Sequence, residues 1–380
     1  MSCPRIFLIA GEASGDALGA ALMRALRESR PDAEFIGVGG RAMTREGLAS
    51  LFPMTEIAVM GLVPVIARLR AILARIEETS QAVLDENPDC LVVIDAPDFT
   101  HRVARKVRRA NARIPVVDYV SPTVWAWRPG RARKMREYVD CVLALLPFEP
   151  EAHQKLGGPR CVYVGHPLVE KLDELSRQPD KADPPLLLVL PGSRLAEIAR
   201  MTPIYGETLA LLLRDHPQLD VAIPVAPNME AALREALRGW PIVPRLLSQS
   251  EKFAAFGKAH AALVTSGVAT LELALARTPM VVAYRVSRLE SFLRFLVKVH
   301  SIVLPNLVIG ENAIPEFLQE AATPRTLAEA VAPLLLAESP ARASQLAAFE
   351  RVRARLIEAG ARPSARAAEI VLEYAAFSRS

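Results

Sequence analysis

The chain has 380 residues, of which 51% are hydrophobic, and it carries a formal net charge of +4 at pH 7. Its length predicts two domains, and the lack of a charge-free run of about 18 apolar residues argues against a transmembrane helix. The mild positive charge suits an anionic substrate or an anionic membrane surface, whereas no nucleic-acid motif, His-Glu-x-x-His motif or paired cysteine spacing occurs, so we expect neither a nucleic-acid partner nor a metal site.

Short apolar segments of the first half predict six strands, at residues 5–10, 34–38, 89–94, 114–119, 141–145 and 161–164. The first apolar run is too short for a secretory signal peptide, so we expect the protein to stay in the cytoplasm. Residues 11–16, Gly-Glu-Ala-Ser-Gly-Asp, lead into a helix that ends at about Glu28. Such a loop can hold an anion or hydroxyl groups. Because Glu12 and Asp16 would repel a phosphate, we expect it to meet sugar hydroxyls, with a simple capped turn as the alternative.

An apolar stretch that contains Met60, Leu62 and Val63 comes before the next expected helix. That helix carries an apolar stripe, which includes Leu69 and Leu73, with arginines around it. A basic amphipathic helix beside an apolar loop can lie on an anionic membrane. The same stripe could equally face the protein core, and both interpretations stay open.

Two carboxylates follow the strand expected over residues 89–94, in the sequence Asp95-Ala96-Pro97-Asp98. Open α/β sheets bind their ligands at the carboxyl ends of parallel strands. We therefore expect Asp95 to act as a general base toward a substrate hydroxyl, and Asp98 to cap the following helix.

The loop after residues 114–119 contains Trp125 and Trp127, followed by Arg128 and Arg131. Aromatic side chains among arginines could stack on bases, contact sugar rings or lie at a membrane interface. The residues alone leave these alternatives open.

The second half opens with an unbroken apolar run, residues 186–190, which is typical of a parallel strand buried on both faces. In the turn that follows, Gly192 permits close backbone approach, Ser193 can cap the next helix and Arg194 can reach an anion. We expect that helix to extend from about residue 202 to 214. An ordinary strand-to-helix turn is the alternative.

Further strands are predicted at residues 221–225, 241–246, 261–265 and 280–284, and a further helix at 229–238. After the third of these strands, Ser266 and Gly267 begin a helix whose N-terminus could bind a diphosphate. Glu272 could accept hydrogen bonds from ribose hydroxyls, or it could simply favour the helix dipole. Asn306 is a polar residue in an apolar loop, beyond a second amphipathic stripe over residues 289–297.

Seven short motifs, in this order, resemble those of the lipid-A-disaccharide synthases, the glycosyltransferases of Gram-negative lipid A assembly. They are Gly-Glu-Ala-Ser-Gly-Asp (11–16), Ala-Val-Met-Gly (58–61), Asp-Ala-Pro-Asp-Phe (95–99), Tyr-Val-Ser-Pro-Thr-Val-Trp-Ala-Trp (119–127), Leu-Pro-Gly-Ser-Arg (190–194), Ser-Gly-Val-Ala-Thr-Leu-Glu (266–272) and Leu-Pro-Asn-Leu (304–307). Each motif alone is weak, but together they span most of the chain.

The resemblance implies an α/β fold of the GT-B type, in which two Rossmann-like domains face each other across a cleft. The first, residues 1–170, would take the acceptor and face the membrane, and the second, residues 171–362, would bind the UDP-sugar donor. A final helix at about residues 363–380 would pack back on the first domain. The implied reaction transfers 2,3-diacylglucosamine from its UDP derivative to the 6-hydroxyl of 2,3-diacylglucosamine 1-phosphate, with inversion and without a cofactor.

The resemblance also implies roles for individual residues. Asp95 would be the catalytic base, and Arg194 would stabilise the departing diphosphate. The expected donor-binding residues are Gly192, Ser193, Arg194, Ser266, Gly267, Glu272 and Asn306. The residues expected to line the facing side of the cleft are Glu12, Ser14, Asp16 and Trp125. The residues expected to contact the membrane are Met60, Leu62, Val63, Leu69 and Leu73.

The expected location is therefore peripheral, on the anionic cytoplasmic face of the inner membrane, and a homodimer is compatible with the sequence. Two other functions remain as alternatives. One is an epimerase acting on a UDP-N-acetylhexosamine with the same fold, and the other is a non-catalytic, nucleotide-responsive membrane-binding protein.

Overall fold

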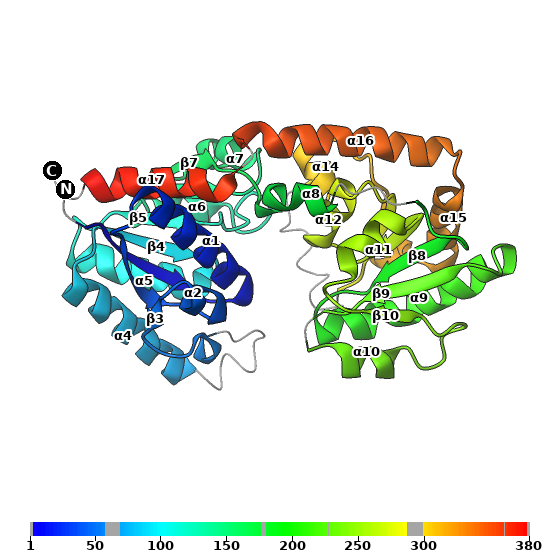
Figure 1. The fold of residues 1–380 in the computed structure, drawn as a ribbon, viewed down its shortest axis with the longest axis horizontal. Helices are drawn as coiled ribbons and strands as arrows, with labels where there is room; N and C mark the ends of the chain where they lie inside the picture. The colour runs from blue at the N-terminus through cyan, green and yellow to red at the C-terminus, as the bar shows by residue number, and fades with distance from the viewer. Residues whose placement is uncertain are drawn as a thin grey trace. The chain divides into compact units, whose positions relative to one another are not determined.

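The computed structural model describes residues 3–57, 69–175, 180–226, 228–286, 299–360 and 362–377. The chain forms two compact units, each built on a parallel sheet (Figure 1). One unit comprises Met1–Val169 together with Glu358–Ser380, and the other comprises Glu170–Ile357. Among the helices in these described ranges, none is both long and apolar enough to cross a membrane.

The first unit contains a seven-stranded sheet in the order β3-β2-β1-β4-β5-β6-β7, with every pair parallel. Its strands are β1 (Arg5–Ala10), β2 (Glu34–Val38), β3 (Ala49–Ser50), β4 (Cys90–Ile94), β5 (Val116–Tyr119), β6 (Cys141–Ala144) and β7 (Arg160–Tyr163). The six strands predicted from apolar runs all form, within two residues at either end. The short edge strand β3 has no apolar run and was not predicted.

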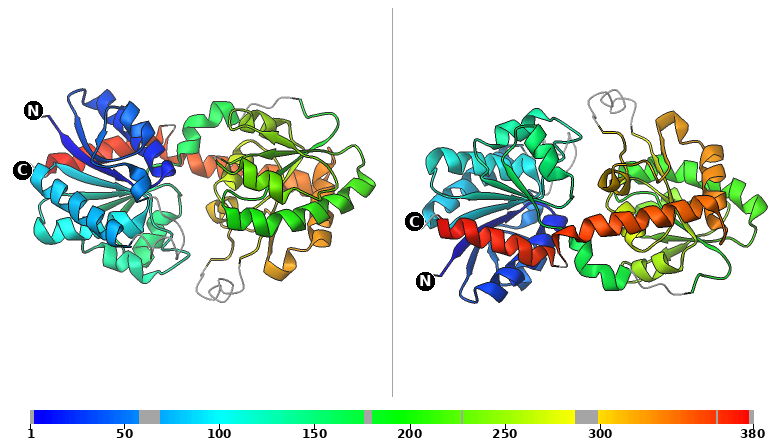
Figure 2. Two further views of the ribbon diagram at one scale, coloured as in Figure 1. Left: turned by 90° about the horizontal axis from the view of Figure 1, so that it is seen from below. Right: turned by 90° about the horizontal axis from the view of Figure 1, so that it is seen from above.

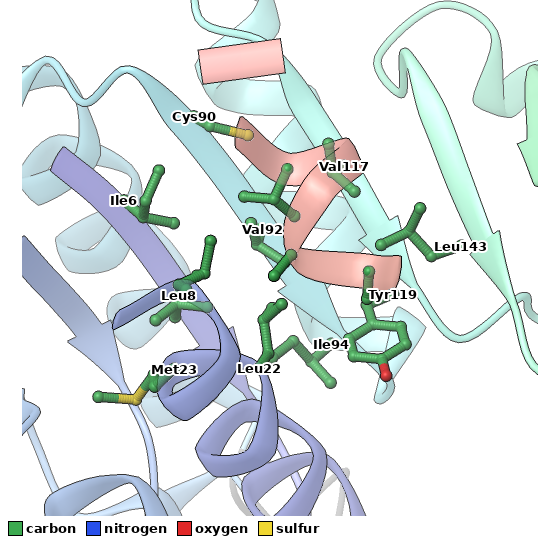
Figure 3. Packing of buried hydrophobic residues seen from close by; sticks show 14 of the residues in the cluster. Ile6, Leu8, Leu22, Met23, Cys90, Val92, Ile94, Val117, Tyr119 and Leu143 are labelled. Atoms are coloured by element: carbon green, nitrogen blue, oxygen red, sulfur yellow. The ribbon is translucent and has the colours of Figure 1, made fainter. Parts of the chain in front are cut away.

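Helices cover both faces of this sheet (Figure 2). They are α1 (Ala13–Ser29), α2 (Arg41–Arg45), α4 (Leu69–Glu86), α5 (Pro97–Ala110), α6 (Gly130–Met135), α7 (Glu149–Lys155) and α17 (Pro363–Phe377). Because side chains alternate along a strand, Ile6 and Leu8 of β1 pack toward α1 and α17, whereas Phe7 and Ile9 pack toward α4 and α5. Figure 3 shows the first of these clusters, in which Leu22 of α1 lies among side chains of β1, β4, β5 and β6.

The C-terminal helix α17 belongs to this first unit, because it packs against α1 (Figure 1). Its buried face consists mainly of small residues, among them Ala367, Ala368 and Ala375, with Ile370 and Val371 between them. Small side chains let the helix approach the sheet closely, so α17 completes the core of a unit that is otherwise built from the first part of the chain.

The second unit contains a six-stranded parallel sheet in the order β10-β9-β8-β11-β12-β13. Its strands are β8 (Leu186–Leu190), β9 (Asp220–Pro224), β10 (Arg245–Leu247), β11 (Ala261–Val264), β12 (Met280–Tyr284) and β13 (Glu316–Leu318). All five residues of β8 are buried, as its continuous apolar run predicted. The strand predicted at residues 241–246 begins later, at Arg245.

The described helices of the second unit are α8 (Leu172–Leu175), α9 (Leu195–Asp215), α10 (Glu230–Ala236), α11 (Lys252–Lys258), α12 (Ala269–Leu275), α14 (Leu304–Ile309), α15 (Pro324–Leu335) and α16 (Pro340–Leu356). The prediction that α9 begins near residue 202 was wrong, because the helix begins at Leu195 and contains Pro203 in its interior. Ile198 and Met201 are buried in the core of the unit. Their packing compensates for the backbone hydrogen bond that a proline removes.

Candidate functional site

Asp95 lies at the carboxyl end of β4, where its backbone adopts a left-handed conformation with φ 55°. Its N–H donates to the carbonyl of Tyr119 over 3.1 Å, which ties the turn to β5. On the side chain, Oδ1 accepts from the Ala96 N–H at 2.8 Å, and Oδ2 accepts from the Ser14 hydroxyl at 3.1 Å. The carboxylate is therefore held in a defined orientation while it stays partly exposed, as a proton acceptor for a substrate hydroxyl requires.

Two glycines of the 11–16 motif allow the loop before α1 to pack against the turn that carries Asp95. A Cβ atom on Gly11 would lie 2.4 Å from the Cβ of Ala96, and one on Gly15 would lie 3.1 Å from the carbonyl oxygen of Ile94. Larger residues at these positions would push the two turns apart. The close approach is what brings Ser14 within hydrogen-bonding distance of Asp95.

Asp16, the last residue of this motif, has a different environment from the one predicted. It is buried, and its Oδ1 accepts from the N–H groups of Gly40 at 2.8 Å and Met43 at 3.0 Å. Its Oδ2 accepts from the N–H of Ala42 at 2.8 Å. The carboxylate thus caps α2, and the expectation that it lines a substrate surface is not supported by this geometry. Glu12, the N-cap residue of α1, is only half-buried.

A cavity of about 230 Å³ opens beside Asp95 in the first unit. It is lined by Asp95, Pro97, Val120, Ser121, Pro122, Thr123, Val124, Trp127 and Arg131. Most of these residues belong to the loop after β5, which the sequence singled out for its tryptophans. The structure therefore brings together two motifs that are more than twenty residues apart in the chain.

The backbone around this cavity is strained. Val120 has φ 89°, a value that β-branched residues rarely adopt, and Asp95, Ala96 and Arg128 also have positive φ. Conformations of this kind persist only where the surrounding structure enforces them, and they concentrate at functional sites. No residue pattern predicts a valine in this conformation, so this feature was missed from the sequence.

A buried carboxyl group, that of Glu149, holds the loop that contains Trp125 and Trp127. Trp125 Nε1 donates to Glu149 Oε1 at 3.1 Å, and its ring meets the ring of Phe148 edge-on at 5.0 Å. Glu149 Oε2 accepts from the N–H groups of Leu145 at 3.1 Å and Leu146 at 2.9 Å. Burial raises the pKa of Glu149 to about 7, although these donors act in the opposite direction. Trp125 is therefore committed to an internal contact.

A second buried contact supports the same loop. Ser121 Oγ lies 2.8 Å from His153 Nε2, and burial lowers the pKa of His153. Of the two tryptophans in this loop, Trp127 lines the cavity and its ring stacks with the Arg128 guanidinium, 5.4 Å from the ring centroid. The aromatic residue beside Asp95 is thus Trp127, whereas the sequence prediction assigned Trp125 to the substrate.

In the second unit, the turn after β8 is organised by Glu197, a residue that sequence reasoning missed. Gly192 has φ 112°, and a Cβ atom there would lie 2.5 Å from the Cβ of Glu197. Glu197 Oε2 accepts from the Ser193 N–H at 3.0 Å, and Oε1 accepts from Arg194 Nη1 at 3.3 Å. The signal for this role was a glutamate in the first helical turn, from which a side chain can reach back to free N–H groups.

The predicted cap at Ser193 was wrong, because Arg194 is the N-cap residue of α9 and its own side chain makes no capping hydrogen bond. The Arg194 side chain is 62% exposed, with Glu197 as its ion-pair partner. A guanidinium that is this accessible keeps donors available for an anion. The position therefore suits the role of phosphate contact that the sequence predicted.

The Ser266 turn starts at the same edge of the sheet, because β11 pairs directly with β8 and Val264 lies opposite Leu190. Helix α12 begins at Ala269, so Ser266 and Gly267 precede the helix. Ser266 Oγ donates to the carbonyl of Ile302 at 2.7 Å, and Gly267 has φ 146° with open space around its Cα. A residue without a side chain in such open space allows a ligand to approach the backbone closely.

Glu272 is nearly buried, and its Oε2 lies 2.5 Å from Lys252 Nζ of α11. The lysine is also close to the rings of Phe253 and Phe256, with its Nζ at 5.5 Å and 5.6 Å from their centroids. No pattern in the sequence predicts that a residue of α11 pairs with Glu272. Any ligand that binds Glu272 meets this ion pair and not an isolated carboxylate.

Asn306 was expected in a loop but lies in α14, where it is fully buried. Its Nδ2 donates to the carbonyl of Ile314 at 2.9 Å and to Ser301 Oγ at 3.2 Å, while its Oδ1 accepts from the Ile314 N–H at 2.9 Å. The amide therefore joins the segments on either side of α14. This geometry does not support direct contact between Asn306 and a donor substrate.

Of the residues predicted to contact the membrane, only Leu69 and Leu73 lie within the described ranges. Met60, Leu62 and Val63 lie outside them, as does the second stripe at residues 289–297. On α4, the side chains of Leu69 and Leu73 are exposed, at 42% and 47%. Farther along the same helix Ile76 is buried in the core. The apolar stripe of α4 is thus exposed at Leu69 and Leu73 and buried at Ile76.

Comparison with known proteins gives a consistent result. Residues 6–371 match a family model described as lipid-A-disaccharide synthetase. The chain is 52% identical to the lipid-A-disaccharide synthase of Nitrobacter hamburgensis, over all of this chain and 97% of that protein. It is 53% identical to that of Rhodopseudomonas palustris, over 97% of this chain and 95% of that protein.

Solved structures with the same fold are more distant in sequence. The UDP-GlcNAc 2-epimerase from Neisseria meningitidis bound to UDP-GlcNAc has a TM-score of 0.61 at 12% identity, covering 97% of this chain and 98% of that one. CalG4, the calicheamicin glycosyltransferase, has a TM-score of 0.58 at 17% identity, covering 98% of both chains. These similarities confirm the predicted GT-B-like α/β fold.

Proposed function

The chain belongs to the lipid-A-disaccharide synthase family, and from this premise we propose how its residues carry out the reaction. The protein is the glycosyltransferase that forms the lipid A disaccharide. The observation that carries this conclusion is the family match over residues 6–371. We propose UDP-2,3-diacylglucosamine as the donor and 2,3-diacylglucosamine 1-phosphate as the acceptor. The two alternative functions, an epimerase and a non-catalytic binding protein, are not favoured by this match.

Asp95 is proposed as the base of an inverting displacement. An α-linked donor and a β-1′,6-linked product require one direct attack by the acceptor hydroxyl on the anomeric carbon. The 6-hydroxyl proton passes to the Asp95 carboxylate as the new C–O bond forms and the bond to UDP breaks. Ser14 and the Ala96 N–H donate to this carboxylate, which supports its orientation toward the cavity.

The donor-binding role is proposed for the edge of the second sheet where β8 and β11 end. Negative charge develops on the diphosphate as the glycosidic bond breaks, and preorganised donors stabilise such charge effectively. The accessible Arg194 guanidinium and the backbone at Gly267 are the groups that support this assignment. The Glu272–Lys252 pair would hold the rest of the nucleotide sugar by hydrogen bonds.

Contact with the cytoplasmic face of the inner membrane is proposed because both substrates carry acyl chains that reside in the bilayer. The exposed leucines at the start of α4 support this location. Exposed aliphatic side chains at the end of a helix can enter the interface between headgroups and acyl chains. Leu69 and Leu73 are the described residues that would make this contact.

A mixed-micelle assay tests the proposed reaction. Purified protein would be given both acylated substrates in the presence of a chelator, and UDP and disaccharide would be followed together. Equal production of the two products is the expected result, without a requirement for a divalent metal. Release of UDP without disaccharide would indicate hydrolysis or another acceptor. An absence of turnover from folded protein would contradict the proposal.

A further inference from the structure

A second cavity, of about 390 Å³, lies next to the one beside Asp95. It is lined by Asp98, Arg105, Arg128, Gly130, Arg131 and Lys134. Four of these six residues are cationic, and the one carboxylate among them, Asp98, is 92% exposed with its Oδ1 at 3.5 Å from Arg131. One exposed carboxylate cannot balance four positive charges. The cavity is therefore suited to an anionic ligand.

Two of the four cations are oriented by contacts with aromatic rings. Arg105 stacks over the ring of Tyr138 at 4.6 Å, and Arg128 lies over the ring of Trp127 at 5.4 Å. Within the described ranges, neither Arg128 nor Lys134 forms an ion pair with another residue. Stacking fixes the plane of a guanidinium group without neutralising it, so the positive charge stays available.

Arg131 lines both this basic cavity and the cavity of Asp95. A ligand held by Arg131 through an anionic group is therefore adjacent to the candidate base. A hexosamine 1-phosphate carries both groups on one ring, because its phosphate is bonded to C1 and its primary hydroxyl is borne by C5 through C6, on the two sides of the ring oxygen. Arginine forms paired hydrogen bonds with phosphate oxygens, and a dianionic phosphomonoester would offset much of the excess charge.

We propose that Arg128, Arg131 and Lys134 bind the phosphomonoester of the acceptor sugar while Asp95 receives the proton of its hydroxyl. This inference rests on the proposed function, since it assumes that the acceptor carries a phosphate. The headgroup phosphate of a membrane lipid has the same chemistry. The cavity shared through Arg131 favours the acceptor, because a headgroup has no reason to bind next to the catalytic carboxylate.

The test compares two acceptors that differ only in the phosphate, 2,3-diacylglucosamine 1-phosphate and 2,3-diacylglucosamine. The variants are Arg128→Gln, Lys134→Gln and the double substitution. Arg133→Gln is the matched control, because this exposed arginine lies next to Lys134 on α6 but lines neither cavity. All altered side chains are exposed, and thermal unfolding would verify that each variant stays folded.

For the phosphorylated acceptor we expect kcat/KM to fall about tenfold in each single variant and about a hundredfold in the double variant, as for the loss of charge-assisted hydrogen bonds. On the acceptor without phosphate, kcat/KM should stay unchanged, as should the KM for the donor. The control should behave as wild type on both acceptors. The variants would thus lose discrimination between acceptors and not activity in general.

Three results would overturn the inference. An equal loss on both acceptors would mean that the basic residues do not recognise the phosphate. Unchanged kinetics with weaker binding to vesicles containing anionic phospholipid would assign the cavity to a lipid headgroup. Unchanged kinetics and unchanged vesicle binding would leave the cavity without either ligand. Failure of the proposed function is distinguishable, because wild-type protein would then form no disaccharide from the phosphorylated acceptor.

Discussion

At the scale of single residues, the carboxylates of Asp95 and Asp16 have different roles. Asp95 is partly exposed and has one hydroxyl donor from another segment, whereas Asp16 is buried and accepts from three backbone N–H groups. The surroundings of the two carboxylates therefore distinguish Asp95, the candidate base, from Asp16, the cap of α2, although both follow apolar segments in the sequence. Substitutions at the two sites should therefore affect different measured quantities.

We expect Asp16→Ala to lower the free energy of unfolding by about 2–3 kcal/mol, because it leaves buried N–H groups at the start of α2 without an acceptor. UDP affinity should not change. Ser14→Ala is the paired control, since Ser14 is exposed and its loss should reduce turnover with little effect on stability. Chemical denaturation and steady-state kinetics would separate the effects. Normal stability of Asp16→Ala would contradict the capping role.

The raised pKa of Glu149 predicts that the stability of the protein depends on pH. Its pKa is raised to about 7 by burial, compared with 4.5 as the ordinary value. The unfolded chain releases this proton at a lower pH than the folded protein does. Protonation of Glu149 therefore stabilises the folded state fully below the unfolded pKa of 4.5, and this stabilisation is lost as the pH rises through 7. Relative to Glu149→Gln, the free energy of unfolding of wild type should fall by about 2–3 kcal/mol between pH 5 and pH 8.

The control for this experiment is Glu151→Gln on the same helix. Glu151 is exposed, and its hydrogen bond with Lys155 lowers its pKa, so it should contribute nothing to the pH dependence above pH 5. Denaturant titrations at four pH values would suffice. A difference between wild type and Glu149→Gln that is constant with pH would show that Glu149 is ionised throughout the range.

At the scale of elements, apolar periodicity located the strands well. The bounds of β1, β2 and β12 were predicted without error, because buried parallel strands are continuous apolar runs that end where polar turns begin. The start of helix α9 was predicted seven residues too late, because Pro203 in its interior indicated a helix boundary whereas core packing extends the helix back to Leu195. The short strands β3 and β13 have too few residues to produce a pattern.

The candidate site was predictable only in part. Asp95 and Arg194 follow apolar strands, so their positions at sheet edges could be inferred from the sequence. The contacts of Asp16, Glu149 and Asn306 could not, because each joins a side chain to backbone groups of a distant or adjoining segment. Hydrogen bonds of this kind leave no periodic signal, so the backbone contacts of Asp16 and Asn306 could not be inferred from the motifs that contain them.

Helix α4 provides a test of membrane contact. The double variant Leu69→Ser, Leu73→Ser should bind anionic vesicles at least about tenfold more weakly, since each exposed leucine loses the gain from burial in the bilayer. Its stability should be near that of wild type, because both side chains are exposed. Ile76→Ser is the contrasting variant, and it should destabilise the first unit. Unchanged vesicle binding by the double variant would contradict the membrane role of this helix.

At the scale of the whole molecule, the proposed chemistry is divided between two units. The first supplies the proposed base and the basic cavity, and the second supplies the proposed donor contacts. The division is not a simple cut of the chain, because α17 returns to complete the first unit. Variants in the two units should consequently change different kinetic constants.

Arg194→Ala should weaken UDP binding about tenfold and lower turnover, because a charge-assisted contact with the diphosphate is lost. Arg214→Ala, an exposed position in the last turn of the same helix, is the matched control. Calorimetric titration with UDP gives the affinity directly. An unchanged UDP affinity in Arg194→Ala would remove this residue from the donor site.

Asp95 is proposed to accept the proton of the acceptor hydroxyl, and the variant Asp95→Asn tests this role. This substitution keeps the shape of the side chain and removes its basicity. Disaccharide formation at saturating substrates should fall by about 10²–10⁴-fold, the usual contribution of a general base, while calorimetric UDP affinity stays as in wild type. Turnover close to wild type, from a variant that binds UDP normally, would show that another group accepts the proton.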